Sequence, residues 1–424
     1  GFLQASGSAY LLVEDSLQNK SGLIRAGQNM LIAADDSGSA TTQLLNRSAL
    51  IVAENGHMAI NAREIINERS TFATAGGEVR GHDIIAIEEV ACASNCALTV
   101  SGSYRLYEKI LADSPQSLLY AGGDMHIEAE NLDNRHSAIH ASGRLDLLVD
   151  NITQLAWRPT AYVMDEQWQV NTTQAGYDNL AAQLRDYHRQ GVEQYTLHHL
   201  LSDVKWTYDG SIDIAESKAL YDYFGFEIDT VFKDRALILP TLLRNTPALT
   251  SERSMLDDAS PASYTGFVSA GAAINASVDQ WTLRQHQSSD NVYRAASGSG
   301  ATDRSSLANA LLRPVADNHA LQSDSSIRAV LSGNWNNEHS IAANGDFSLS
   351  AGGSLHNAVA GDIQAANIDL ASADHLIQSS DLSAGGELKL SSALDLILSD
   401  ATALVSGRSV DLRGDRVVVK SDLI

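Results

Sequence analysis

The sequence predicts a mainly β protein: a right-handed parallel β-helix interrupted by a non-repetitive module that contains helices. Three observations support this fold class. A unit of about 20 residues recurs along the chain, apolar and polar residues alternate within it, and glycine-polar pairs separate its short segments. Repetition at such a period is typical of solenoids, in which each repeat forms one coil.

The repeat is clearest near the end of the chain. One apolar position after the glycine corner is occupied, at intervals of 20 to 22 residues, by Phe347, Ile368, Leu388 and Val410. In the N-terminal part Met125 and Leu145 are 20 residues apart, whereas Met30, Met58 and Ile84 are separated by 28 and 26 residues. We expect these three residues to mark coils that carry longer loops.

Within each unit the apolar residues alternate with polar ones. Met125, Ile127 and Ala129 fall on one side of an extended chain, and His126 and Glu128 fall on the other. A period of two indicates half-buried strands. Glycine corners between such strands permit a positive φ, so each unit can close into a coil that stacks about 4.8 Å above the preceding one.

Asparagine recurs at a fixed offset from the glycine corner. The residues at this position are Asn19, Asn46, Asn67, Asn134, Asn337 and Asn357. In stacked coils their amides would lie above one another, where they could donate and accept hydrogen bonds along a ladder. The alternative, that asparagine simply favours turns, does not explain the fixed offset. We therefore predict a structural asparagine ladder.

Two segments carry the repeat most fully, YAGGDMHIEAENLDNRHSAIHASGRLDL at 120–147 and LSAGGELKLSS at 382–392. They resemble the repeats of filamentous haemagglutinin and of the CdiA exoproteins of contact-dependent growth inhibition. The resemblance covers about 250 residues in two blocks. It implies a β-helical filament that is secreted to the surface of a Gram-negative cell through a dedicated outer-membrane transporter. The family's export domain is not visible, so we expect an internal piece of a longer chain.

The repeat disappears between residues 152 and 263. This segment holds 10 of the 18 Trp and Tyr residues and 4 of the 6 Pro residues. Helical patterns appear at 178–190 and at 213–225, the second with a capping-box relative and a terminal glycine. The predicted domains are a β-helix block at 1–151, an aromatic-rich module at 152–263, a degenerate coil plus polar loop at 264–325, and a β-helix block at 326–424.

The resemblance implies that a non-repetitive region between repeat blocks recognises the target cell. For CdiA the target is an outer-membrane receptor, either a β-barrel protein or lipopolysaccharide. Aromatic and arginine side chains dominate binding hot spots. The candidate receptor-binding residues are therefore Trp157, Arg158, Tyr162, Trp168, Arg189, Trp206, Tyr208, Tyr221 and Tyr223. The alternative for each aromatic residue is a place in the core of a small domain.

The only two cysteines are Cys92 and Cys96. Their spacing could close a small disulfide loop in an oxidising compartment, with free thiols as the alternative. A metal site is disfavoured because there is no second pair of cysteines. We predict a Cys92–Cys96 disulfide, no metal and no cofactor.

The net charge of −23 arises from 52 acidic and 29 basic residues. Such a chain repels phosphate backbones, so we expect no nucleic-acid partner. Its apolar runs are far shorter than the roughly 20 residues of a membrane helix. We expect a monomer whose partners are the export transporter and the receptor.

No G-x-S-x-G elbow, H-E-x-x-H or P-loop occurs in the sequence, so we predict that the protein is not an enzyme. The predicted function is receptor binding on neighbouring bacteria for contact-dependent toxin delivery. One alternative is an adhesin of the filamentous-haemagglutinin type that binds host cells, weakly favoured by the RGD triplet at 413–415. A minor alternative is a β-helical polysaccharide-degrading enzyme, which would need paired carboxylates on one face.

Overall fold

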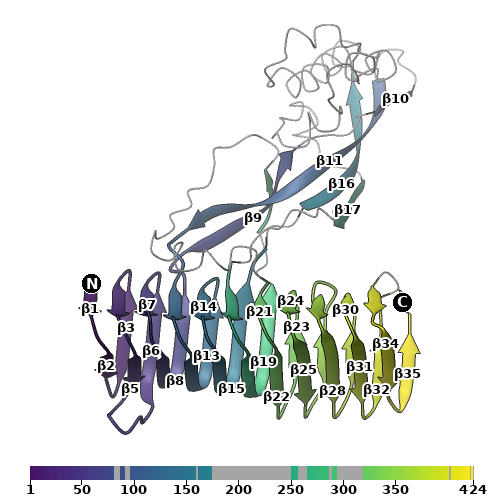
Figure 1. The fold of residues 1–424 in the computed structure, drawn as a ribbon. Helices are drawn as coiled ribbons and strands as arrows, with labels where there is room; N and C mark the ends of the chain where they lie inside the picture. Colours follow the sequence, from purple (N-terminus) through teal and green to yellow (C-terminus); the bar gives the residue numbers. More distant parts are fainter. Residues whose placement is uncertain are drawn as a thin grey trace, which may run out of the picture.

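The computed structural model describes residues 1–80, 86–90, 96–158, 161–173, 250–255, 265–285, 289–293, 319–400, 403–420 and 422–423. These residues form a rod of stacked β coils and a second sheet that projects from it (Figure 1). The predicted parallel β-helix is confirmed. The helices predicted at 178–190 and 213–225 lie outside the described residues, and no helix in the described part could span a bilayer.

The rod has three faces, each a stack of parallel strands. The first face is a 12-stranded sheet. Its strands, in order, are β1 (Phe2–Ala5), β4 (Leu23–Ala26), β7 (Leu50–Ala53), β12 (Leu118–Ala121), β14 (Ala138–Ala141), β18 (Phe267–Ala270), β21 (Leu321–Ser323), β24 (Ile341–Ala343), β27 (Ile363–Ala365), β30 (Leu382–Ala384), β33 (Leu404–Ser406) and β36 (Asp422–Leu423).

The second face starts with β2 (Ala9–Leu12) and β5 (Met30–Ala33) and ends with β22 (Ile327–Leu331), β25 (Asp346–Ala351), β28 (Asn367–Ser372), β31 (Glu387–Ser392) and β34 (Ser409–Arg413). The third face starts with β3 (Ser16–Lys20) and β6 (Thr41–Arg47) and ends with β23 (Trp335–Asn337), β26 (Leu355–Asn357), β29 (Leu376–Gln378), β32 (Asp395–Leu398) and β35 (Arg416–Val419). Between them, four long strands run through both faces: β8 (Met58–Glu68), β13 (Met125–Arg135), β15 (Leu145–Ala156) and β19 (Ile274–Gln285).

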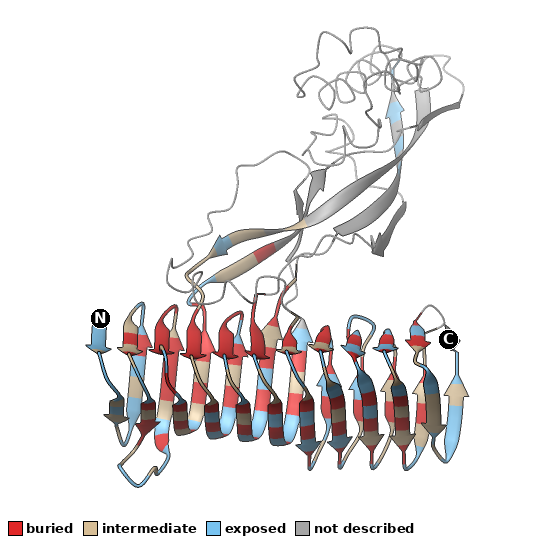
Figure 2. Cartoon of the chain, viewed as in Figure 1, coloured by how far each residue is buried: buried red, intermediate tan, exposed pale blue. Residues whose placement is uncertain are grey.

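The core lies inside the coils, and buried residues alternate with more exposed ones along many strands of the second and third faces (Figure 2). One inward column, in register from coil to coil, is Met30, Met58, Met125, Leu145, Ile274, Ile327, Phe347, Ile368, Leu388 and Val410. The spacing of 20 to 22 residues is therefore one coil. Ile84, which was expected to mark a coil, lies outside the described residues, and Met58 pairs directly with Met125.

Buried asparagine amides are connected along the inside of one corner, between the third face and the first face of the next coil. The Nδ2 atom of Asn19 donates to Oδ1 of Asn46 at 3.1 Å, Asn46 donates to Asn67 at 2.9 Å, and Asn67 donates to Asn134 at 2.9 Å. Further along, Asn337 donates to Asn357 at 2.7 Å. Each of these amides is at most 6% exposed.

The same amides also hold the backbone at this corner. Asn19 donates to the carbonyl oxygen of Leu50 at 2.9 Å, and Asn67 donates to that of Ala138 at 3.0 Å. Both acceptors are the first residues of first-face strands. Each amide therefore ties its own coil to the side chain and to the main chain of a neighbouring coil.

Two glutamines that the sequence pattern did not predict also belong to this column. Gln154 pairs in register with Asn134, and its Nε2 atom donates to the carbonyl oxygen of Ala320 at 2.6 Å. Gln378 accepts a hydrogen bond from Asn357 at 3.1 Å. Both glutamines lie one repeat after a ladder asparagine. Counting one further repeat from Asn134 and from Asn357 in the sequence therefore reaches them. Leu283 occupies the same register position and divides the column into two parts.

A second ladder runs along the corner between the first and second faces, which we call the polar corner. There, the backbone N–H of each coil donates to the side chain one coil earlier. The backbone N–H of His57 donates to Oδ1 of Asn29 at 2.9 Å, that of Asp124 donates to Nδ1 of His57 at 2.9 Å, and that of Arg144 donates to Oδ1 of Asp124 at 2.8 Å. A Cβ atom at Gly122 on this corner would collide with the carbonyl oxygen of Glu54, which explains the glycine.

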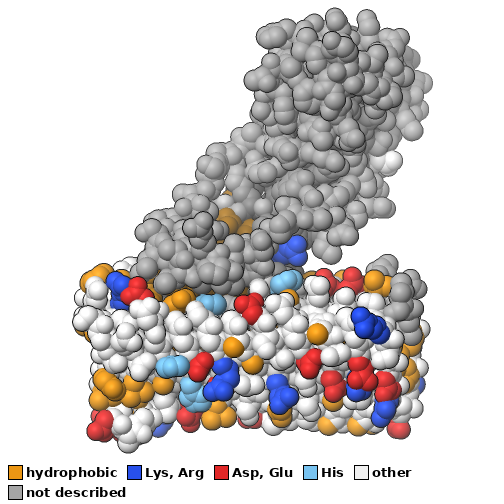
Figure 3. All heavy atoms as spheres, viewed as in Figure 1, with side chains coloured by type: hydrophobic (Ala, Val, Ile, Leu, Met, Phe, Trp, Pro, Cys, Tyr) orange, Lys and Arg blue, Asp and Glu red, His pale blue; other side chains and the backbone are white. Residues whose placement is uncertain are grey.

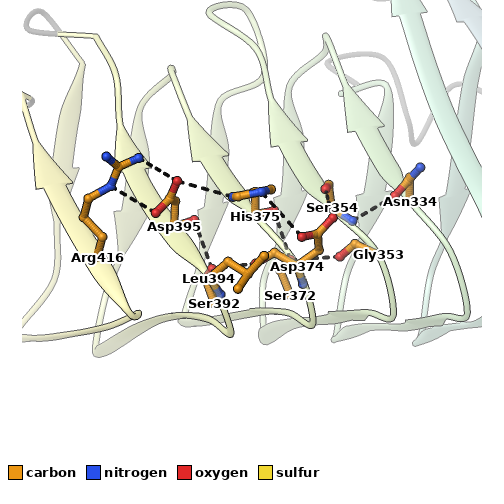
Figure 4. A network of polar contacts seen from close by, with 10 residues as sticks. All are labelled: Asn334, Gly353, Ser354, Ser372, Asp374, His375, Ser392, Leu394, Asp395 and Arg416. Atoms are coloured by element: carbon orange, nitrogen blue, oxygen red, sulfur yellow. Dashed lines mark hydrogen bonds and ion pairs between the residues drawn. The ribbon is translucent and has the colours of Figure 1, made fainter.

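An outer chain of polar contacts crosses the C-terminal coils (Figure 4). The Oγ atom of Ser354 donates to Asp374 at 2.9 Å, and His375 lies 3.5 Å from Asp374 and 3.6 Å from Asp395. Arg416 donates to both oxygens of Asp395, which lowers the pKa of that carboxyl. Because these groups are partly exposed, they contribute little to stability compared with the buried amides.

The ladder predicts different effects for two adjacent asparagines. Asn337 is buried and hydrogen-bonded to Asn357 and His339, whereas Asn336 is exposed. Asn337→Ala should cost about 1–3 kcal/mol, because it leaves buried polar groups without partners. Thermal unfolding followed by circular dichroism should show a lower midpoint for Asn337→Ala and an unchanged midpoint for Asn336→Ala. Equal midpoints for the two variants would contradict a stabilising ladder.

Candidate functional site: the projecting sheet

The chain leaves the described coils three times at the same corner, the one lined by the asparagine ladder. It departs after β8, after β15 and after β19, and it re-enters the first face at β12, β18 and β21, respectively. The crossing from β13 to β14 passes the same corner through only His136 and Ser137. The corner therefore accepts either a short turn or a long insertion.

The three insertions contribute strands to one sheet of six strands, which we call the projecting sheet. The first gives β9 (Phe72–Arg80), β10 (Ala86–Val90) and β11 (Cys96–Asp113), the second gives β16 (Ala161–Thr172) and β17 (Thr250–Met255), and the third gives β20 (Ser289–Tyr293). β11 and β16 pair antiparallel from Cys96–Thr172 to Tyr107–Ala161. β20 pairs in parallel with β9. Segments far apart in sequence are thus joined by main-chain hydrogen bonds.

This pairing differs from the predicted domain boundaries. The sequence predicts residues 72–113 in the first β-helix block, but the structure pairs strands of this segment with one another and with β16 and β20. The reason is that strands in a coil and strands in an antiparallel sheet both alternate with a period of two. Composition marked 152–263 as different because that segment is rich in aromatic residues and proline.

A buried ion pair lies at the root of the first insertion. The Nη1 atom of Arg69 is 2.9 Å from Oδ2 of Asp113, and both side chains are 2% exposed. The same guanidinium donates to the carbonyl oxygens of His136 and Ser114 at 2.8 and 3.1 Å. Arg69 thereby joins the beginning and the end of the insertion to the short β13–β14 corner in the next coil.

Aromatic packing links the first insertion to the second. The ring of Phe72 stacks on His136 at 4.2 Å and meets Trp157 edge-on at 5.7 Å. Trp157 also exchanges two backbone hydrogen bonds with Thr265, at 3.0 and 2.8 Å, which closes the root of the second insertion. Gly266 has a φ of +88° and lies against the backbone of His136, which favours glycine at this return point.

The outer side of the first face is apolar beside these roots. Its outward residues form a buried cluster of Leu50, Val52, Leu118, Tyr120, Ala138 and Phe267, each at most 9% exposed. In the later coils the outward positions of this face hold polar residues such as Gln322, Gln364 and Ser383, of which the last two are exposed. The apolar cluster, which we call the seat, therefore coincides with the coils that bear the insertions.

A histidine is buried in the same outward row. His140 is 7% exposed, and its Nδ1 atom lies 2.8 Å from Oγ of Ser269. Burial disfavours the charged ring and lowers the pKa of His140 to about 4. The outward row beside the seat therefore contains a group that is neutral in the folded protein at neutral pH.

The described residues include four of the nine predicted receptor-binding residues. Trp157 is 3% exposed and Arg158 is half-buried, both at the root of the second insertion. Tyr162 and Trp168 lie on β16, and their side chains fall outside the described set. Burial of Trp157 fits the alternative that it is a core residue. Outside the described residues are Arg189, Trp206, Tyr208, Tyr221 and Tyr223.

The predicted disulfide also lies outside the described set. Cys92 is not described, and Cys96 is described only as the first backbone position of β11. Within the described part of the chain, no group of three or more His, Cys, Asp and Glu side chains could hold a metal ion. The Cys92–Cys96 disulfide stays a prediction.

The ion pair at the root predicts a local loss of stability when its arginine is removed. Arg69→Ala leaves the buried Asp113 carboxylate without its cation and should cost about 3–5 kcal/mol. Hydrogen exchange should show faster exchange in β9 and β11, with protection retained in the C-terminal coils. Arg63→Ala, at an arginine that is 66% exposed on β8, should leave exchange unchanged. Unchanged exchange in both variants would refute the role assigned to Arg69.

His140 predicts a loss of stability in mild acid. Its pKa in the folded state lies below its unfolded value of about 6.5, so above pH 6.5 the ring is neutral in both states and costs nothing. As pH falls from 6.5 toward 4, the unfolded state takes up the proton first, and stability falls by up to about 3 kcal/mol. Thermal unfolding between pH 7.5 and 5 should show a shallower pH slope for His140→Gln than for the native chain. An identical slope would exclude His140 as the source.

Three curated proteins are similar in sequence to the chain. Toxin CdiA of Escherichia coli is 25% identical over 189 residues, which covers 39% of this chain and 6% of that protein. Two proteins named tRNA nuclease CdiA, from Escherichia coli O6:K15:H31 (strain 536 / UPEC) and Escherichia coli (strain NC101), are 22% identical over 200 residues, which covers 36% of this chain. The chain spans about 6% of the length of these relatives. No protein-family model matches the chain, and no solved structure gives a significant match.

The prediction that the protein is not an enzyme is corrected by this comparison. Two of the three relatives carry the name of a nuclease, which is an enzyme. The prediction rested on the absence of catalytic motifs from this chain. The matched part is about 6% of the length of the two nuclease relatives, so that absence says nothing about the remainder of those proteins.

The resemblance seen in the repeats is confirmed by these relatives, all three of which are named CdiA. The parallel β-helix agrees with the fold that the resemblance implied. Together, the coils and the three relatives support a CdiA-like protein.

Proposed function

We propose that the chain is the target-recognition part of a contact-dependent inhibition exoprotein, in which the projecting sheet and the rest of its insertions bind an outer-membrane receptor. The receptor would be a β-barrel protein or lipopolysaccharide on a neighbouring bacterium. The longer protein would be secreted through an outer-membrane transporter, displayed on the cell surface, and would deliver a toxin such as the nuclease named for two relatives.

The observation that carries the proposal is the convergence of three insertions from one corner on a single sheet. A rod built from coils alone presents three repetitive faces, whereas this sheet projects away from them (Figure 1). Recognition residues are commonly found on loops that a rigid scaffold positions. The Arg69–Asp113 pair and the aromatic contacts at the roots supply such support here.

Exposed side chains of β16 offer one surface for contact. Gln167, Gln169 and Asn171 alternate along the strand and are exposed. They are uncharged, in a segment (152–263) that carries 16 acidic and 9 basic residues. A neutral strip within an acidic module suits a protein surface better than the phosphates of lipopolysaccharide, so we favour a protein receptor.

The test compares the native chain with a coil-only variant. In that variant residues 70–116, 158–264 and 286–319 are each replaced by the short turn found at His136–Ser137, and Leu118, Tyr120 and Phe267 are changed to glutamine to keep the seat soluble. The native chain should bind outer-membrane vesicles from Escherichia coli, and the coil-only variant should not, while circular dichroism shows that its strands are retained.

A second variant keeps the test valid if the coil-only chain fails to fold. Changing Gln167, Gln169 and Asn171 to glutamate should weaken vesicle binding at least tenfold. The matched control changes Gln322, Gln364 and Ser383 to glutamate on the first face of the later coils and should bind like the native chain. Equal binding by the native and coil-only chains would overturn the proposal. Binding to epithelial cells but not to bacterial vesicles would favour the host-adhesin alternative.

A further inference from the structure

A hollow lies on the second face of the rod, where β2, β5, β8 and β13 run side by side. Its volume is about 340 Å³, at the lower end of the range for small-molecule sites, about 300–1,000 Å³. Histidine, acidic and basic side chains gather near the N-terminal end of the rod face seen in Figure 3. The hollow borders the polar corner rather than the corner from which the insertions leave.

The hollow arises from the side chains of one outward row. Tyr10, Leu31, Ala59 and His126 follow one another in register across the four strands, and Asp146 comes next. Ala59 has the shortest side chain in this row, so a depression remains between Leu31 and His126. The depression has an apolar floor, and the ring of Tyr10, which is 70% exposed, stands at one end.

The polar rim of the hollow is fixed before any ligand arrives. It consists of Asn29, His57, Asp124 and Arg144, three of which accept a backbone N–H from the following coil. Because Nδ1 of His57 accepts the N–H of Asp124, the neutral ring carries its proton on Nε2 and can donate from there. Carboxylate and amide oxygens of the rim can accept hydrogen bonds.

We propose that this hollow binds a neutral pyranose unit of a glycan. A pyranose ring has an apolar face of C–H groups, which suits the Tyr10 ring and the alkyl floor, and hydroxyl edges, which suit paired donors and acceptors. Charge disfavours an acidic sugar. Asp124 and Asp146 outnumber Arg144, and the Nε atom of Arg144 already donates to Asp146 at 2.9 Å. The site is separate from the projecting sheet and does not depend on the function proposed for it.

The experiment uses saturation-transfer NMR on the full chain, with the methyl glycosides of glucose, galactose, mannose and N-acetylglucosamine as probes and N-acetylneuraminic acid as the acidic comparison. At least one neutral glycoside should give a saturable signal. Ala59→Leu fills the depression without removing a polar contact and should weaken binding at least tenfold, about 1.4 kcal/mol. Tyr10→Ala should weaken it to a similar extent.

The matched control is Ala371→Leu, at another half-buried alanine on the second face in a distant coil, which should bind like the native chain. Circular dichroism would verify that each variant keeps its strands. The proposal fails if no neutral glycoside binds the native chain, if Ala59→Leu binds as well as the native chain, or if only the acidic sugar binds. Loss of receptor binding by the coil-only variant, with sugar binding retained, would separate this site from the projecting sheet.

Discussion

The rest of the structure depends on the hydrogen bonds of buried amides at one corner of the rod. Each of Asn19, Asn46 and Asn67 donates to the amide of the next coil and to the carbonyl that begins a first-face strand. These bonds satisfy polar groups that would otherwise be costly to bury. They also fix the height and the direction of each coil as it turns this corner.

This constraint explains how the first two insertions are tolerated, whereas Leu283 replaces the amide in the coil from which the third insertion leaves. The first insertion departs one residue after Glu68, and Asn67 still connects its coil to Asn134 and Ala138. Loop length adds little entropic cost once the two ends of a loop are held together. The rod can therefore fold in the same way whatever the sequence of the insertions at this corner. The Arg69–Asp113 pair then sets how the first insertion leaves.

Much of the rod was predictable from the sequence, because stacking repeats the same physical problem in every coil. The inward column through Phe347, Ile368 and Leu388 and the asparagine positions follow directly from the period. The sequence pattern predicts only a glycine turn at the polar corner, since the side chains there differ in chemistry (Asn29, His57, Asp124) although each accepts the same backbone hydrogen bond. Only the register reveals that common role.

The projecting sheet was harder to foresee, because its pairing is non-local. Residues 72–113 alternate in polarity like coil strands, and nothing in their local pattern identifies β16 or β20 as partners. The apolar outward residues of the seat were the available signal. Leu50, Leu118 and Phe267 are apolar at outward positions, and they are buried beside the insertions. The nine receptor-binding candidates were chosen by residue type, and burial of Trp157 shows why type alone cannot separate contact from core.

The central claim is that the rod positions the projecting sheet for recognition. Hydrogen exchange measured on the native chain, free and bound to outer-membrane vesicles of Escherichia coli, tests this claim most directly. Binding should slow exchange in β11 and β16 and leave exchange in β25, β28 and β31 unchanged. Slower exchange along the coils, with β11 and β16 unaffected, would contradict it.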